Sequence, residues 1–145
     1  MLDRDAMVAR IKDVIDARMA GRGADAMALI APDATYEIAA DVANLPGFPP
    51  GGLAKDAVGD LIGLITYHSV TYDKPIVEGN RVAMVMHVDA EANGIRHPLR
   101  LCGLWEFDAA GRPTSLVEYA DTAAMRDWLT RGSTAPTIEP VQPAA

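Results

Sequence analysis

Hydrophobic residues near the N-terminus recur at spacings of three and four, which is the pattern of an amphipathic helix. The repeat runs through Met7, Val8, Ile11, Val14, Ile15 and Met19. Asp3 is a suitable N-cap for this helix, and Gly21 is a suitable residue to end it. Similar but shorter helical patterns cover residues 24–31, 55–67 and 122–130.

The period of the pattern changes to two in the second half of the chain, as in half-buried strands. Strands are predicted at residues 34–38, 70–78, 81–92, 95–107 and 114–119. Short turns that contain Gly separate the last four strands, so we expect antiparallel hairpins. The element order therefore predicts an α+β protein with its helices on one face of an antiparallel sheet.

A loop rich in proline and glycine interrupts the pattern at residues 44–52. Prolines remove backbone donors and glycines add backbone freedom, so this segment cannot form regular structure. It still carries Leu45 and Phe48, and an irregular loop with apolar residues is a candidate for the mouth of a cavity.

The chain length of 145 residues fits one domain. We expect that domain to cover residues 1–131. Residues 132–145 contain three prolines and few large apolar residues, and they are predicted to form a mobile tail.

Acidic residues outnumber basic ones by 20 to 13, which gives a formal charge of −7. This charge disfavours nucleic acids and anionic membrane surfaces as partners. The sequence has no apolar run long enough to span a bilayer, and its acidic beginning is unlike a signal peptide. Cys102 is the single cysteine, which fits a reducing compartment. We therefore expect a cytoplasmic protein.

The predicted strand 81–92 carries the first candidate chemistry. His87, Asp89 and Glu91 share one face by period two, whereas the other face is uniformly apolar. A carboxylate two residues from an imidazole can orient it and stabilise its charge. Partial burial would move the pKa values of both groups toward those of an acid–base pair. The same alternation is also normal for a sheet with one wet face, so exposure of these residues remains an equal alternative.

Two further candidates lie on the first and last predicted strands. Glu118 shares its face with Leu116 and Ala120. A carboxylate among apolar residues is either an exposed edge residue or a buried functional group. Tyr36 shares its face with Ile38 and is either structural or a hydrogen-bond donor to a substrate oxygen.

Metal and cofactor motifs are not found in the sequence. Three scattered histidines and Cys102 do not have the spacing of a zinc site, and Gly51-Gly52 lacks the residues of a phosphate-binding loop. We expect neither a metal nor a cofactor, and a structural role for Cys102.

Two local patterns resemble the nuclear transport factor 2-like superfamily. They are Ala31-Pro32-Asp33-Ala34-Thr35-Tyr36-Glu37 and Leu116-Val117-Glu118-Tyr119-Ala120-Asp121. The resemblance covers roughly residues 2–130. It implies a cone-shaped, strongly curved antiparallel sheet of the cystatin-like type, with the N-terminal helices packed on its concave face. The superfamily includes SnoaL-like cyclases, ketosteroid isomerase, scytalone dehydratase and limonene-1,2-epoxide hydrolase.

The limonene-1,2-epoxide hydrolase-like branch is the most similar, because a proline-rich loop follows its first strand. Its catalytic Arg, Asp and second Asp match His87, Asp89 and Glu118, and the tyrosine that positions water matches Tyr36. The water-binding Asn of that branch is Ile38 here, which is also where the base of ketosteroid isomerase would fall. Because His87 can transfer a proton and the Asn is lost, the resemblance favours dehydratase-like chemistry over epoxide hydrolysis.

These observations predict a cofactor-free lyase or isomerase for a small cyclic or aromatic, mostly apolar substrate. His87 would be the general acid or base, with Asp89 orienting it. Glu118 would be the second acid–base group, and Tyr36 would bind the substrate oxygen. The expected lining of the cavity is Ile38, Phe48, Leu99, Leu101, Trp105 and Leu116. One alternative is an epoxide hydrolase that activates water between Asp89 and Glu118. Another is a small-molecule-binding module without catalysis.

Apolar residues on the second face of the sheet indicate that a partner subunit covers it. Its expected apolar residues are Met84, Met86, Val88, Leu104, Val117 and Tyr119. This is more apolar surface than a monomer leaves exposed unless helices cover it. We therefore expect a homodimer.

Overall fold

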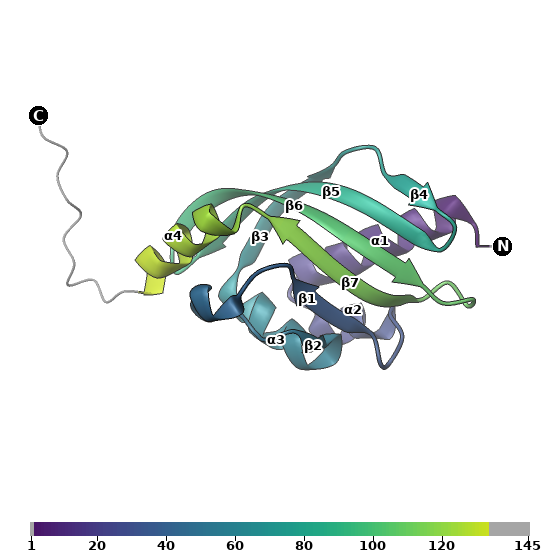
Figure 1. Cartoon of the computed structure of the whole chain (residues 1–145), viewed down its shortest axis with the longest axis horizontal. Helices are drawn as coiled ribbons and strands as arrows, with labels where there is room; N and C mark the ends of the chain where they lie inside the picture. Colours follow the sequence, from purple (N-terminus) through teal and green to yellow (C-terminus); the bar gives the residue numbers. More distant parts are fainter. Residues whose placement is uncertain (1, 134–145) are drawn as a thin grey trace, which may run out of the picture.

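The computed structural model describes residues 2–133 of the chain (Figure 1). The tail expected at residues 132–145 lies outside the described residues, apart from its first two positions. The helices are α1 (Arg4–Met19), α2 (Gly23–Ala28), the 3-10 helix η1 (Val42–Asn44), α3 (Ala54–Leu64) and α4 (Thr122–Ser133). The strands are β1 (Thr35–Ile38), β2 (Gly52–Leu53), β3 (Thr66–Tyr72), β4 (Ile76–Glu78), β5 (Arg81–Ala92), β6 (Ile95–Phe107) and β7 (Pro113–Ala120).

Helix α1 begins and ends where the sequence pattern predicts. The Oδ1 atom of Asp3 accepts hydrogen bonds from the backbone N–H groups of Asp5, at 2.8 Å, and Ala6, at 3.2 Å. These bonds satisfy two of the donors that the start of a helix leaves free. The apolar stripe is buried through Met7, Ile11, Val14 and Ile15.

The longest hairpin joins β5 to β6 and has the predicted boundaries. Its turn is Asn93-Gly94, with φ values of 52° and 81°. Asn and Gly adopt this left-handed conformation most readily, and such two-residue turns match the twist of a hairpin. The pairing runs from Arg81 opposite Glu106 to Ala92 opposite Ile95.

The predicted α+β class is confirmed, and one strand pairing differs from the antiparallel expectation. The strand order is β2-β1-β7-β6-β5-β3, and β4 pairs with β5. Strand β1 pairs in parallel with β7, with Tyr36 opposite Leu116 and Ile38 opposite Glu118. The two strands are not joined by a hairpin, so nothing in the connection forces them to be antiparallel. The sheet is curved and does not close into a barrel.

The predicted boundaries differ from the structure between α3 and β4. The expected helix 55–67 ends at Leu64, and Tyr67 belongs to β3. The β-branched residues Ile65 and Thr66 favour the extended conformation there. The expected strand 70–78 is divided into β3 and β4 at residues 73–75, where Pro75 has no N–H for the ladder.

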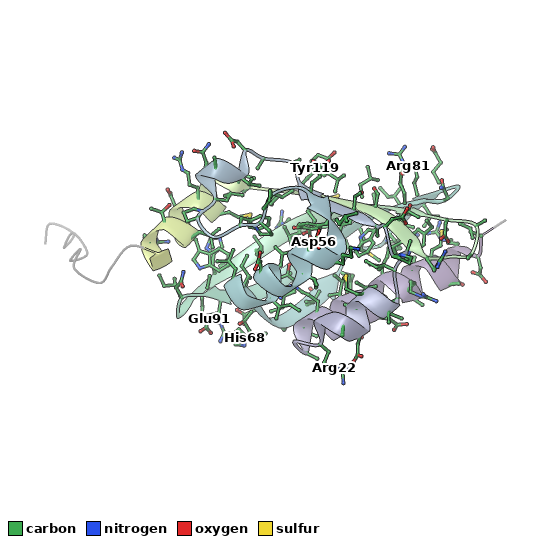
Figure 2. All side chains as sticks on the ribbon, turned by 90° about the horizontal axis from the view of Figure 1, so that it is seen from below. Arg22, Asp56, His68, Arg81, Glu91 and Tyr119 are labelled. Carbon is green, nitrogen blue, oxygen red and sulfur yellow. The ribbon has the colours of Figure 1, made fainter. Side chains whose placement is uncertain are left out.

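The helices cover the face of the sheet that the alternation of β5 marks as apolar. Figure 2 shows α1 and α3 lying over one face, with the labelled Tyr119 and Arg81 on the side away from α1. Met84, Met86 and Val88 are buried on the covered face. Their expected place on the outer face is therefore wrong. Because Met86 pairs with Leu101, residues of both strands that share a face with this pair point toward the helices. No helix within residues 2–133 is long and apolar enough to cross a membrane.

Candidate functional site

An apolar cavity lies between the covered face of the sheet and the helices, with a volume of about 90 Å³. Tyr36 and Glu118 line it, as do all six residues expected to contact a substrate: Ile38, Phe48, Leu99, Leu101, Trp105 and Leu116. Apart from Phe48, these residues lie on strands, and the alternation of side chains directs them to the covered face. Phe48 comes from the proline-rich loop, which therefore reaches the cavity. The small volume favours a small ligand.

Tyr36 and Glu118 form a hydrogen-bonded pair in this cavity. The phenol of Tyr36 donates to Oε1 of Glu118 at 2.6 Å. The parallel pairing of β1 with β7 sets this contact, because it places Ile38 opposite Glu118 and leaves Tyr36 on the same face. Only 7% of Glu118 is exposed. A short hydrogen bond from a hydroxyl is a strong one when its acceptor is a carboxylate.

Burial governs the ionisation of both members of the pair. Desolvation raises the pKa of Glu118, while the hydrogen bond from Tyr36 and the charge of Arg18 lower it in part. Desolvation also raises the pKa of Tyr36, and the nearby Glu118 carboxylate raises it further. A raised pKa makes the carboxylate a stronger proton acceptor than an exposed glutamate, and such shifted groups are typical of acid–base sites.

Arg18 is a cavity residue that the sequence analysis missed. Its Nη1 donates to the carbonyl oxygen of Ile65 at 2.8 Å, and its Nη2 donates to that of Leu61 at 3.1 Å. A signal existed in the sequence, because Arg18 follows Ile15 by three residues and Val14 by four. That spacing puts a charged residue on the buried stripe of α1.

Tyr67 is the second missed residue of the cavity. The guanidinium carbon of Arg18 lies 3.7 Å from the centroid of the Tyr67 ring, which is close enough for a cation–π contact. Burial raises the pKa of Tyr67, and the charge of Glu118 adds to this effect. The helical pattern expected at residues 55–67 includes Tyr67, so its place on a strand that faces the cavity was not predicted.

His87 and Asp89 lie outside the cavity, on the opposite face of the sheet. Nε2 of His87 is 3.0 Å from Oδ1 of Asp73, and 39% of the His87 side chain is exposed. Asp89 pairs with Arg96, whose hydrogen bonds lower the pKa of this carboxyl group. The expectation that the imidazole and two carboxylates converge is therefore wrong.

The alternation of paired strands explains this separation. Glu118 pairs with Gly103, and Gly103 pairs with Met84, so these three residues share the covered face. His87 and Asp89 differ from Met84 by an odd number of residues and must point the other way. Within residues 2–133, no three His, Cys, Asp or Glu side chains are grouped so that they could hold a metal ion.

Comparisons with known proteins define the fold. No protein-family model matches the sequence, and no curated protein sequence matches it. Among solved structures, the chain is similar to a protein of Rhodopseudomonas palustris whose name suggests an isomerase. The TM-score is 0.72 at 13% identity, over 90% of this chain and 99% of that one.

Two other solved structures support the same fold. An LEH-like epoxide hydrolase from M. tuberculosis has a TM-score of 0.67 at 19% identity, over 88% of this chain and 92% of that one. An NTF2-like protein from Burkholderia xenovorans LB400 also has a TM-score of 0.67, at 17% identity, over 92% of this chain and 100% of that one. The predicted nuclear transport factor 2-like fold is confirmed. At these identities the similarity is one of fold, which hosts many chemistries.

Proposed function

We propose that this protein is a small-molecule-processing enzyme of the isomerase or lyase type, with Glu118 as the group that transfers a proton. The observation that carries the proposal is the buried Tyr36–Glu118 hydrogen bond of 2.6 Å at the wall of an apolar cavity. A buried carboxyl group is costly, and such groups are concentrated at functional sites.

The chemistry follows from the surroundings of Glu118. As the carboxylate, it takes a proton from a carbon atom next to a carbonyl group of the substrate. As the acid, it returns that proton to another carbon, which completes an isomerisation without a net gain or loss of atoms. In a lyase the electron pair instead expels a leaving group. Apolar walls exclude water, which would otherwise compete for the proton.

The named activities of the similar proteins support a small-molecule-processing enzyme, without favouring one reaction. One name suggests an isomerase and another states an epoxide hydrolase. Activation of water between Asp89 and Glu118 has no geometric support here, because the two carboxylates lie on opposite faces of the sheet. Glu118 is the only carboxylate that lines the cavity within the described part of the chain.

Deuterium exchange tests the proposal without knowledge of the natural substrate. The protein is incubated in D2O with a panel of small cyclic ketones, and loss of the proton next to the carbonyl group is followed by NMR. We expect catalysed exchange for at least one ketone, and a decrease of about 100-fold or more in Glu118→Gln. Glu106→Gln is the matched control, because Glu106 pairs with Arg81 and does not line the cavity.

The outcomes separate the three candidate functions. Exchange that persists in Glu118→Gln would overturn the assigned role of this residue. Binding of the ketones without any exchange would favour the non-catalytic binding module. Incorporation of oxygen from ¹⁸O-labelled water into an opened epoxide would favour the hydrolase.

His87→Ala separates the cavity from the outer face as the site of chemistry. Because the His87 side chain is partly exposed and bonded to Asp73, we expect the exchange rate to change by less than about two-fold. A loss in His87→Ala comparable to that in Glu118→Gln would support the proposal made from sequence and contradict the one made from the cavity.

A further inference from the structure

Arg18 is the only positively charged residue that lines the cavity within residues 2–133. It belongs to α1, and it shares the cavity with a single negative group, Glu118. An arginine remains charged at any ordinary pH, so the cavity keeps one permanent positive charge. In the role assigned to Glu118, this charge acts only by lowering the pKa of that carboxyl group.

The position of the guanidinium is fixed by its surroundings. Its bonds to the carbonyl oxygens of Leu61 and Ile65 attach α1 to the end of α3, and its central carbon lies 3.7 Å from the centroid of the Tyr67 ring. A guanidinium has five N–H donors. The two carbonyl bonds use two of them, and a hydrogen bond to the Tyr67 side chain uses another. The group is thus held in place and keeps further donors for an oxygen atom of a ligand.

Proton removal next to a carbonyl group places negative charge on the carbonyl oxygen, and that charge needs a partner. The phenol of Tyr36 already donates to Glu118. A fixed guanidinium in a cavity of low polarity stabilises such a charge more strongly than a neutral donor does.

We propose that Arg18 binds the substrate oxygen, and that the substrates are small, apolar, cyclic carbonyl compounds whose oxygen becomes negative during the reaction. The choice of substrate class rests on the proposed function of Glu118. The binding of a negative oxygen by Arg18 is a separate physical claim and can be measured without turnover.

A pair of probes with matched shape measures this claim. Cyclohexanecarboxylate carries a negative oxygen, and cyclohexanecarboxamide is its neutral counterpart. Both are titrated by calorimetry into Glu118→Gln, which removes the repulsive carboxylate and leaves Arg18 unchanged. We expect the dissociation constant of the carboxylate to be lower than that of the carboxamide by about 10-fold or more, as for a charge-assisted hydrogen bond. Equal affinities would overturn the proposal.

Arg18→Met in the same background removes the charge and keeps much of the side-chain volume. We expect the preference for the carboxylate to disappear. Arg10→Met is the matched control, since Arg10 lies on the same helix and also donates to a backbone carbonyl, that of Leu29, at 2.8 Å. Arg10 does not line the cavity, so this variant keeps the preference. Retention of the preference in Arg18→Met would overturn the proposal.

A second measurement avoids dependence on the folding of Arg18→Met, because Arg18 also joins two helices. The ¹⁵N resonances of the Arg18 guanidinium are followed in Glu118→Gln while each probe is added. We expect a shift with the carboxylate that the carboxamide does not produce. Resonances that do not move with the carboxylate would contradict direct binding.

Failure of this inference and failure of the proposed function give different results. Catalysed deuterium exchange with equal affinities for the two probes removes the role of Arg18 and leaves that of Glu118. A preference for the carboxylate without any exchange confirms the site at Arg18 and removes the proposed catalysis.

Discussion

The hydroxyl of Tyr36 donates to the carboxyl group of Glu118 at 2.6 Å, across 82 positions of the sequence. This contact exists because the short strand β1 runs parallel to β7 at the point where β7 carries Glu118. One hydrogen bond therefore joins the first strand to the last strand inside the cavity. It opposes the effect of burial on the pKa of Glu118.

Removal of the donor should change the titration of the acceptor. The hydrogen bond from Tyr36 lowers the pKa of Glu118 against the opposing effect of burial. We expect Tyr36→Phe to make the Glu118 carboxyl group titrate at a higher pH than in the unmodified protein. The measurement is ¹³C NMR of the glutamate carboxyl carbons over a pH series. Tyr119→Phe is the control, because Tyr119 is half exposed on the outer face. An unchanged Glu118 titration in Tyr36→Phe would contradict the prediction.

The burial of Glu118 should make stability depend on pH in an unusual direction for a carboxyl group. Its pKa in the folded protein is raised above the ordinary value of 4.5, so the folded state holds the proton more tightly than the unfolded chain. This contribution is fully present below pH 4.5 and is lost as pH rises through the raised pKa. Tyr36 and Arg18 are the ionisable groups that lower this pKa against the effect of burial.

Glu118→Gln lacks this titration, and its unfolding should show the difference. We expect the free energy of unfolding of Glu118→Gln to increase relative to that of the unmodified protein as pH rises from about 4.5 to about 8. Urea denaturation at several pH values measures both proteins. A difference that stays constant over this range would show that the pKa of Glu118 is not raised by folding.

Gly103 makes room for the indole of Trp105, and an added methyl group should disturb the cavity. A Cβ atom at position 103 would lie 2.8 Å from Nε1 of Trp105 and 3.1 Å from Cδ1 of Leu116. We expect Gly103→Ala to lower the free energy of unfolding by about 1–3 kcal/mol, as overpacking does. Gly59→Ala is the control, because nothing lies within 4 Å of a Cβ atom there.

The control should move stability in the opposite direction. Gly59 lies inside α3, where alanine is preferred over glycine by about 0.5–1 kcal/mol. Thermal or urea unfolding of both variants provides the comparison. Gly103→Ala with unchanged stability would mean that the Trp105 ring moves aside without cost.

The outer face of the sheet retains apolar residues that a second subunit would cover. Leu104 pairs with Val117 on this face, and Tyr119 beside them is 49% exposed. We propose a homodimer through this surface. Val117→Arg should shift the protein to monomers in sedimentation at micromolar concentration, because a buried unpaired charge is costly.

A control on the opposite side of the molecule makes this test specific. Ala9→Arg adds the same charge to an exposed position of α1 and should leave the dimer intact. A monomeric unmodified protein, or a Val117→Arg variant that remains dimeric, would contradict an interface at this face.

The local sequence was sufficient for most of the secondary structure. The apolar stripe of α1 begins after Asp3, and the Asn93-Gly94 turn defines the β5–β6 hairpin. Period-two alternation also placed Glu118 with Leu116 and Tyr36 with Ile38 correctly, because neighbouring residues of a strand must point to opposite faces. These features depend on residues that are close together in the chain.

Tertiary structure alone decided which groups share the cavity. His87 and Glu118 both lie on strands with one apolar face, and only the pairing through Gly103 places Glu118 under the helices and His87 outside. The parallel pairing of β1 brings Tyr36 to Glu118. The packing of α1 against α3 brings in Arg18. Alternation fixes the relative faces within one strand, but the register between distant strands and the choice of the covered face depend on contacts far apart in sequence.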